Sequence, residues 1–267
     1  MIYALPLLAP LLLLIASAIS FLNPGLRPRF ALQTAQAAAL GSILVVIGSA
    51  AVLWQFGPGT SPAVGLDPFA FAARLDLVSL VMLGLVSFIG WVVLRFAGTF
   101  LDGEARQGAF TGWMTATLAA VLLLVQSGTL AQLVVGWIAT SLLLHQLLLF
   151  YPERVAAQRA ARKKFIVSRT GDLALIVAMV LLYLSYGTGD IATILAAARE
   201  GVSQPMVIAA AALLALAALL KSAQFPTHGW LTEVMETPTP VSALLHAGVV
   251  NAGGYLLIRF VDVMLLS

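Results

Sequence analysis

Apolar runs long enough to cross a bilayer recur along the whole chain, and they constrain its fold more than any other feature. A membrane-spanning helix needs about 20 predominantly apolar residues. The sequence contains eight candidates of this length or slightly less, at residues 2–22, 31–55, 77–97, 109–126, 129–150, 170–187, 205–225 and 240–265. These runs predict an all-α polytopic membrane protein, with about eight transmembrane helices in a single domain over residues 1–267.

Composition agrees with this class and excludes several kinds of site. Hydrophobic residues make up 61% of the chain and charged residues 9%, whereas a soluble domain carries about 25% charged residues. The chain has no cysteine and three scattered histidines, which excludes disulfides and thiolate metal sites and makes a poor ligand set for zinc. We therefore expect no metal and no cofactor in this chain. The net charge of +3 is accounted for by membrane topology and does not indicate nucleic-acid binding.

The placement of basic residues predicts the orientation in the membrane. Residues 2–22 lack a basic n-region, so we expect a first spanning helix and not a cleaved signal. If the N-terminus lies outside and the number of spans is even, the outward stretches contain Arg74, Arg199 and Arg259. The inward stretches then contain Arg27, Arg29, Arg95, Arg106, Arg154, Arg159, Arg162, Lys163, Lys164 and Arg169. This asymmetry, with Lys221 set aside, follows the positive-inside rule.

A charged and proline-rich segment near the C-terminal end predicts an ion site. Lys221 falls inside an apolar run, where a charge at membrane depth costs about 2.5 to 3.5 kcal/mol. Pro226 is expected to break this seventh helix, and Pro238 and Pro240 are further expected breaks before a span that carries His246. Ionisable groups beside interrupted helices form ion sites at the bilayer midplane. The alternative is that Lys221 snorkels to an interface and Pro226 only ends the helix.

Other ionisable residues are candidates for the same path, each with a structural alternative. Arg169 and Asp172 lie three apart and would pair on one helical turn, either as a helix-entry salt bridge or with Asp172 as a counter-ion of Lys221. His145 on the fifth span is either a packing residue or a proton relay. The candidate residues of the ion path are Lys221, His246, Asp172, His145, His228 and Lys163.

Charged side chains outside the path are candidates for lipid or partner contacts. The segment from residue 154 to residue 169 is basic and is expected either to touch anionic lipid head groups or to present a helical docking face to a cytoplasmic partner. Glu233 and Glu236 either line the ion path or lie in a cytoplasmic turn, and we favour the turn. The candidates for the cytoplasmic or partner face are Arg154, Arg159, Arg162, Lys164, Glu233 and Glu236.

Two long motifs resemble a known superfamily. Lys221-Ser-Ala-Gln-Phe-Pro-Thr-His-Gly-Trp-Leu231 and Met235-Glu-Thr-Pro-Thr-Pro-Val-Ser-Ala-Leu-Leu-His246 resemble the signature of the antiporter-like membrane subunits of respiratory complex I and multisubunit cation/proton antiporters. The resemblance extends back through Lys163-Lys-Phe-Ile-Val-Ser-Arg-Thr-Gly-Asp172 and covers about residues 70–265. It implies that Lys221 is the protonatable centre of a broken seventh helix, with Asp172 nearby and His246 connecting onward.

One position departs from the superfamily pattern. The family usually has a glutamate directly after the tryptophan of the fifth span, paired with the lysine that matches Lys221. Here Ile138 follows Trp137, so Asp172 or His145 is expected to stabilise the charge on Lys221 in its place. The departure argues against a complex I or antiporter subunit.

A further stretch resembles one branch of the superfamily. Ser141-Leu-Leu-Leu-His-Gln-Leu-Leu-Leu-Phe-Tyr-Pro-Glu-Arg154 followed by Ala160-Ala-Arg-Lys-Lys-Phe165 looks like the membrane subunit of the DAB inorganic-carbon complex of the bacterial inner membrane. That resemblance implies a large cytoplasmic, zinc-binding, carbonic-anhydrase-like partner, with the zinc on the partner. Movement of protons, or of sodium, through this chain would then drive the one-way hydration of CO2 to bicarbonate.

The superfamily also implies a domain organisation. Its core is two inverted five-helix repeats, in keeping with the inverted repeats of transporters. Residues 1–107 are expected to form three leading helices and residues 108–267 the first repeat, with the second repeat absent from this chain. Two alternatives remain open: a proton-pumping or antiporter subunit, and a membrane anchor that moves no ions. Catalysis by this chain itself is not expected.

Overall fold

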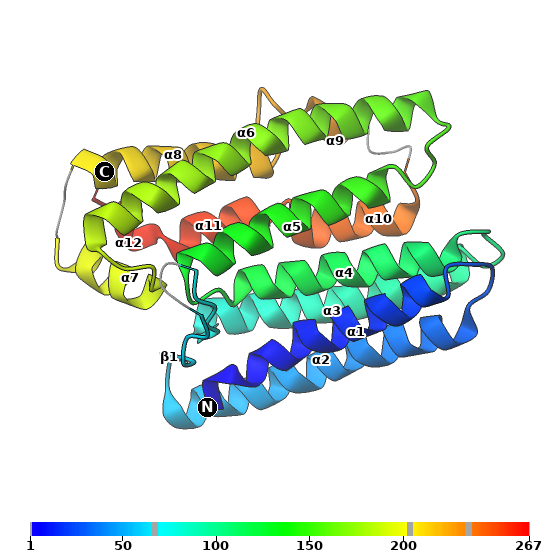
Figure 1. The fold of residues 1–267 in the computed structure, drawn as a ribbon, viewed down its shortest axis with the longest axis horizontal. Coiled ribbons are helices and arrows are strands. Elements are labelled where there is room, and N and C mark those ends of the chain that lie inside the picture. The colour runs from blue at the N-terminus through cyan, green and yellow to red at the C-terminus, as the bar shows by residue number, and fades with distance from the viewer. Residues whose placement is uncertain (1, 66–68, 202–204, 233–236, 267) are drawn as a thin grey trace.

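The structure, a computed structural model, describes residues 2–65, 69–201, 205–232 and 237–266 and is a bundle of roughly parallel and antiparallel helices (Figure 1). In this described part, six helical segments are long and apolar enough to cross a membrane. They are η1–α1 (Ile2–Leu7 and Leu8–Leu22), α2 (Arg29–Phe56), α3 (Leu77–Phe100), α4 (Gln107–Val125), α5 (Leu130–Leu148) and α6 (Val155–Tyr186). The prediction of an all-α membrane protein is confirmed.

The C-terminal part contains shorter helices. A surface helix, α7 (Ile191–Arg199), connects α6 to α8 (Pro205–Lys221), and the turn α9 (Gly229–Thr232) follows. The predicted eighth span is divided into α10 (Thr239–Leu244), a π-helical turn (Leu245–Val249), α11 (Ala252–Arg259) and α12 (Val261–Met264). With α8 and this divided segment counted, the arrangement agrees approximately with eight predicted spans. The N-terminus and the C-terminus lie at the same end of the bundle (Figure 1).

Helix α4 is the most buried of the six candidate spans. Most of α4 is buried inside the protein, whereas α2 is mostly exposed, as expected for a helix that is apolar all round and one that faces lipid. Helices α1, α3 and α5 pack against α4. Gly108 allows the closest approach: a Cβ there would lie 1.8 Å from the carbonyl oxygen of Asn23. Small residues let neighbouring helix backbones meet in this way.

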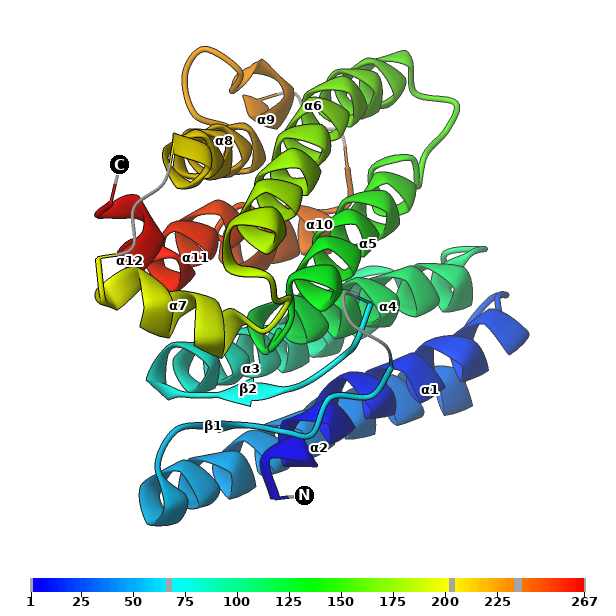
Figure 2. The same ribbon diagram turned by 60° about the vertical axis from the view of Figure 1, so that its left-hand side comes forward.

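A short antiparallel ribbon closes the end of the bundle where the N-terminus lies. Its strands are β1 (Gly59–Thr60) and β2 (Arg74–Leu75), which pair Gly59 with Leu75 and Thr60 with Arg74. The ribbon contains Arg74, which the sequence analysis assigns to an outward stretch, and Figure 2 shows the ribbon beside α2 and α3. Asp76 follows the ribbon and caps α3 in a capping box with Ser79, which fixes where the third span begins.

The sixth span begins earlier than the sequence analysis predicts. We expected it at residue 170, but α6 runs without interruption from Val155 over 32 residues, a length of about 48 Å that exceeds the bilayer core of about 30 Å. Its first turns are rich in alanine and arginine, which are strong helix formers. Arg169 and Asp172 therefore lie in the middle of a helix, and the helix-entry interpretation of this pair is wrong.

The helix breaks fall partly where they were predicted. Helix α8 ends at Lys221, and the chain turns through Ala223 and Pro226 before α9, in agreement with the predicted break. Pro238 and Pro240 do not break a helix: they occupy the N-cap and the first turn of α10, positions that tolerate proline because no intrahelical donor is lost. The interruption of this span is the π-helical turn that contains His246.

Candidate buried ion site

Lys221 lies inside the protein at the end of α8. Its side chain is buried, with the residue 7% exposed. The Nζ atom donates a hydrogen bond to the carbonyl oxygen of Trp137 on α5 at 3.0 Å and lies 4.5 Å from the centroid of the Trp137 ring. The carbonyl and the ring face replace part of the lost hydration of the ammonium group. Lys221 therefore does not snorkel to an interface.

Asp172 faces the same region from α6. It is 4% exposed, and its Oδ2 lies 2.6 Å from the guanidinium of Arg169, one turn earlier. The predicted pairing of these two residues is thus present. Helices α6 and α8 pack closely here, with Gly171 against Ala217 and Leu220. Asp172 and Lys221 consequently interact electrostatically across the α6–α8 contact.

A second buried lysine is part of the same cluster. Lys164, 3% exposed, donates to the carbonyl oxygen of Ser141 at 2.5 Å and to its Oγ at 3.0 Å. The sequence analysis placed Lys164 on the partner face and its neighbour Lys163 in the ion path, whereas the structure buries Lys164 and exposes Lys163. The signal was present, because Lys164, Ser168 and Asp172 recur every four residues and so share one helix face. The predicted start of the span at residue 170 obscured it.

His145 lies one turn beyond Ser141 on α5. Its ring packs against Phe165 at 5.3 Å between centroids, and its buried Nδ1 has no hydrogen-bond partner within the described part of the chain. It lies within electrostatic range of Lys164 and Arg169. Beside it a groove of about 280 Å³ opens at the end of the bundle that carries the α5–α6 turn, lined by His145, Leu149, Gln158, Ala161, Arg162 and Phe165.

The charges of this cluster do not balance. Lys164, Arg169 and Lys221 are three basic groups, and Asp172 is the carboxylate that interacts with all three among the residues described. Ile138 contributes an apolar side chain packed against the core. Uncompensated charges in a buried cluster are costly, so the positive charges of the two buried lysines are balanced in part.

Other candidate residues lie outside this cluster. His246 and His228 are both exposed, and His228 stacks on Phe225 at 5.7 Å. Arg154, Arg159 and Arg162 are exposed at the end of the bundle near the α5–α6 turn, where Arg154 lies over the ring of Tyr151. Glu233 and Glu236 fall outside the described residues.

A second polar network, which the sequence analysis missed, lies at the opposite end of the bundle. Arg259 is buried, 4% exposed, and forms a two-point ion pair with Asp76, while Arg74 binds the same carboxylate at 2.7 Å. Burial by itself raises the pKa of Asp76, but the charge and hydrogen bonds of Arg259, the Ser79 amide and Arg74 outweigh it and hold the pKa well below the usual range. The hydroxyl of Tyr255 accepts from Arg259 and donates to the carbonyl of Val125. Only the tertiary fold brings Asp76 and Arg259 together.

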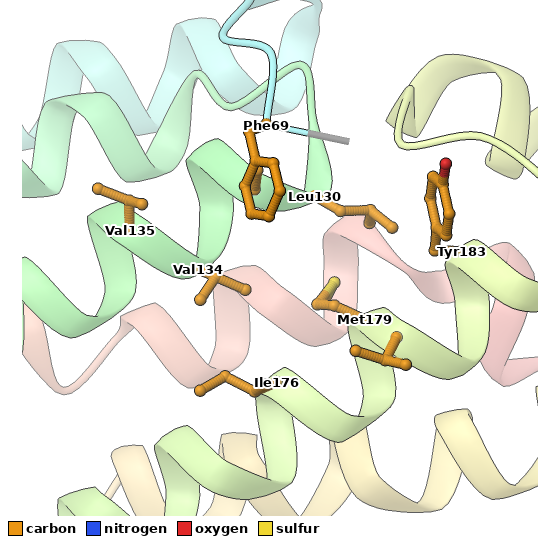
Figure 3. A pocket seen from close by; sticks show the side chains of 9 residues that line it. Phe69, Leu130, Val134, Val135, Ile176, Met179 and Tyr183 are labelled. Carbon is orange, nitrogen blue, oxygen red and sulfur yellow. The ribbon is translucent and has the colours of Figure 1, made fainter. Parts of the chain in front are cut away.

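An apolar groove between α5 and α6 does not belong to either network. Figure 3 shows its lining, a volume of about 270 Å³ bounded by Phe69, Leu130, Ala131, Val134, Val135, Ile176, Met179, Val180 and Tyr183. These walls carry no charged side chain, so the groove offers no sites for an ion. The ionisable side chains of the candidate ion site, Lys164, Asp172 and Lys221, lie where α5, α6 and α8 meet.

The chain matches a family of membrane transport subunits. Residues 127–267 match the family model described as "NADH:quinone oxidoreductase/Mrp antiporter, TM". Among solved structures, the Mrp complex from Dietzia sp. DQ12-45-1b aligns with a TM-score of 0.80 and 30% identity over 96% of this chain and 28% of that chain. The membrane-bound sulfane sulfur reductase, an archaeal respiratory complex, aligns with a TM-score of 0.77 at 17% identity, which supports the fold alone.

Curated relatives fall into two groups. "Probable inorganic carbon transporter subunit DabB" of Hydrogenovibrio crunogenus is 46% identical over 192 residues, covering 71% of this chain and 37% of that protein. DabB2 of Halothiobacillus neapolitanus is 43% identical over 207 residues, covering 77% and 37%. NADH-quinone oxidoreductase subunit L of Mycobacterium tuberculosis is 35% identical over 199 residues, covering 74% and 31%. The chain thus spans 31% to 37% of the length of these relatives. The similarities confirm the predicted superfamily, the closer resemblance to the inorganic-carbon branch and a multi-pass bacterial membrane protein.

Proposed function

The chain belongs to the NADH:quinone oxidoreductase/Mrp antiporter membrane family, and we propose that it is a cation-translocating subunit, with the proton as its leading ion and sodium as the alternative. The observation that carries the proposal is Lys221, a lysine buried where α8 ends and bonded to a backbone carbonyl of α5. Ionisable residues inside membrane segments mark ion pathways. A broken helix beside the charge is the usual setting of such a site.

The finer proposal concerns what the ion movement drives. The most similar curated relatives described above carry names of inorganic carbon transporter subunits, which favours the hydration of CO2 to bicarbonate by a large cytoplasmic, zinc-dependent, carbonic-anhydrase-like partner. One charge that crosses 100 mV carries about 2.3 kcal/mol, and about 1.4 kcal/mol changes an equilibrium tenfold. One proton per turnover would therefore make hydration strongly directional.

The surface for this partner is proposed at the basic end of the bundle. Arg154 at the N-cap of α6 and Arg159 and Arg162 on its first turns are exposed there, and α6 continues directly to Asp172. A partner bound to these arginines would be coupled through one rigid helix to the buried cluster. In this proposal zinc and catalysis belong to the partner, and residues 108–267 act as the first five-helix repeat behind three leading helices.

A second candidate function is a proton-pumping subunit of a redox complex or a cation/proton antiporter. The similarity to NADH-quinone oxidoreductase subunit L and to the Mrp complex favours it. Ile138 at the position of the usual glutamate weighs against it. A membrane anchor that moves no ions is disfavoured by the cost of keeping Lys221 buried.

The test is growth of a carbonic-anhydrase-deficient bacterium in air, with this chain expressed together with its partner subunit. We expect rescue by the wild type and by Lys163→Ala, whose side chain is exposed, but no rescue by Lys221→Ala inserted at equal level. The wild type and Lys163→Ala together control for expression and for loss of one lysine.

The other outcomes separate the alternatives. Rescue by Lys221→Ala at wild-type rates would leave the chain as an anchor and overturn ion coupling. Failure of the wild type, with the complex correctly assembled, would overturn the carbon-uptake proposal and favour the redox-pump or antiporter function.

A further inference from the structure

The side-chain amines of the two buried lysines bind acceptors that lie one turn apart on the same helix, α5. Lys221, from α8, binds the carbonyl of Trp137, and Lys164, from α6, binds the carbonyl and hydroxyl of Ser141. Four residues separate these acceptors on α5, a rise of about 6 Å. Helix α5 therefore aligns two amines from different helices along one row of acceptors.

Each acceptor suits both protonation states of a lysine. A backbone carbonyl has two lone pairs, so it accepts from an ammonium or from a neutral amine beside its helical bond. The hydroxyl of Ser141 accepts from an ammonium and, after rotation, donates to a neutral amine. Neither amine loses its hydrogen bonds when its proton leaves, and this lowers the cost of exchange.

The charge balance disfavours a full positive charge on both lysines. Arg169 is already paired with Asp172 at 2.6 Å, and Lys164 and Lys221 repel each other across the buried space. A single excess proton shared by the two lysines relieves most of this repulsion, because like charges strongly disfavour joint ionisation at close range. Transfer breaks one N–H bond at Lys164 and forms one at Lys221, with no change in total charge.

The row continues towards the basic end of the bundle. His145 follows Ser141 by one turn, its buried Nδ1 is free of partners within the described residues, and it borders the groove that opens at that end. An imidazole accepts a proton at one nitrogen and releases one from the other. The groove, His145, Ser141, Lys164 and Lys221 thus follow one another in this order along α5, each with a group that can exchange a proton.

We propose that Lys164 is a second protonatable site, which exchanges a proton with Lys221 and connects it through Ser141 and His145 with the groove at the basic end. This inference rests on the proposed function as a proton-translocating subunit. It gives the buried amine of Lys164 a role distinct from that of the exposed amine of Lys163, and it identifies the α5 row as a route between the cytoplasmic side and Lys221.

The experiment measures proton flux into liposomes that contain the assembled complex, driven by a potassium diffusion potential and followed with a trapped pH dye. We expect Lys164→Met to lower the flux at least tenfold and its matched control, Lys163→Met, to stay within twofold of wild type. Methionine keeps an unbranched stem in the cavity and removes the amine, with its charge and its hydrogen bonds to Ser141. Ser141→Ala, which keeps the carbonyl and removes the hydroxyl, should lower the flux severalfold.

A pH profile distinguishes a relay from a packing role. Lys164→His should restore part of the flux with an optimum moved to lower pH, because imidazole titrates near 6.5 and lysine near 10.4 in their ordinary environments. A reduced flux with Lys164→Met that Lys164→His neither restores nor shifts would assign Lys164 to packing and overturn the proposal.

The remaining outcomes separate this inference from the proposed function. Wild-type flux in Lys221→Met would overturn both. Loss of flux in Lys221→Met, with equal flux in Lys164→Met and Lys163→Met, would overturn only the relay. If Lys164→Met does not insert, Ser141→Ala decides, and unchanged flux in that variant overturns the proposal.

Discussion

At the scale of single residues, the buried cluster depends on one carboxylate. Asp172 is the acidic group that offsets Lys164, Arg169 and Lys221 in the described part of the protein, and Ile138 supplies no second one. Removing one partner of a buried ion pair costs about 3 to 5 kcal/mol, because the remaining charges lose their compensation. We therefore expect Asp172 to serve both the proposed function and the stability of the fold.

Asp172→Asn is predicted to lower the thermal unfolding midpoint of the purified protein in detergent by several degrees and to reduce ion flux at least tenfold. Asp102→Asn is the matched control, because Asp102 pairs with Arg27 with 56% and 62% of the two side chains exposed, and exposed pairs contribute about 0 to 1 kcal/mol. Tryptophan fluorescence during heating measures the midpoints. Equal midpoints for the two variants would show that the buried cluster does not need this carboxylate.

At the scale of elements, α11 is anchored to the N-terminus of α3 through ion pairs. Arg259 of α11 reaches Asp76 at the N-terminus of α3, and Arg74 of β2 holds the same carboxylate. The connection joins segments 183 residues apart, so it fixes the divided eighth span against the body of the bundle. The depressed pKa of Asp76 links this contact to pH.

The Asp76 contact is predicted to stabilise the fold above about pH 4, the ordinary range of a carboxyl group, and to weaken as the pH falls below it. Its pKa is lowered on folding, so the stabilisation is present above the unfolded pKa and is lost as the pH falls through the folded one. Asp76→Asn keeps a good N-cap and removes the charge. The unfolding midpoint of wild type should exceed that of Asp76→Asn at pH 7, with the gap narrowing only in acid. A gap that is already absent at pH 6 would contradict the prediction.

At the scale of the whole molecule, the described turns that carry most of the basic residues lie together at one end of the bundle. The α1–α2, α3–α4 and α5–α6 turns lie at one end, and the N-terminus, the β-ribbon and the C-terminus lie at the other (Figure 1). With the basic turns inside, the ribbon faces outward. The groove beside His145, at which the proposed relay ends, then opens towards the cytoplasm.

This orientation is testable because the sequence contains no cysteine. Ala63→Cys, in the loop that contains β1 and β2, should react with a membrane-impermeant maleimide in intact cells. Ala105→Cys, in the α3–α4 turn, should react only after permeabilisation. Both side chains are exposed, so a difference in labelling reports sidedness. Labelling of Ala105→Cys alone in intact cells would reverse the topology and move the proposed groove to the outside.

The sequence by itself determined the class and the approximate number of spans, and it identified Lys221 and Asp172 as candidates for the ion site. Hydrophobic run length, the positions of Lys221 and Pro226 and the three-residue spacing of Arg169 and Asp172 are local properties, and a bilayer imposes strong local rules. The five earliest spans were predicted to within a few residues for this reason. The superfamily resemblance added the expectation that Lys221 is the protonatable centre of the broken seventh helix.

Only the tertiary structure decided which charges meet. It buried Lys164 and exposed Lys163, because a single continuous α6 sets the rotation of both residues about the helix axis. It placed the acceptors of two lysines on α5 and paired Arg259 with Asp76 across 183 residues of sequence. The four-residue spacing did place Lys164 on the face of Asp172, but contacts between helices depend on how the faces pack, so no local pattern could specify the acceptors on α5 or the Arg259–Asp76 pair.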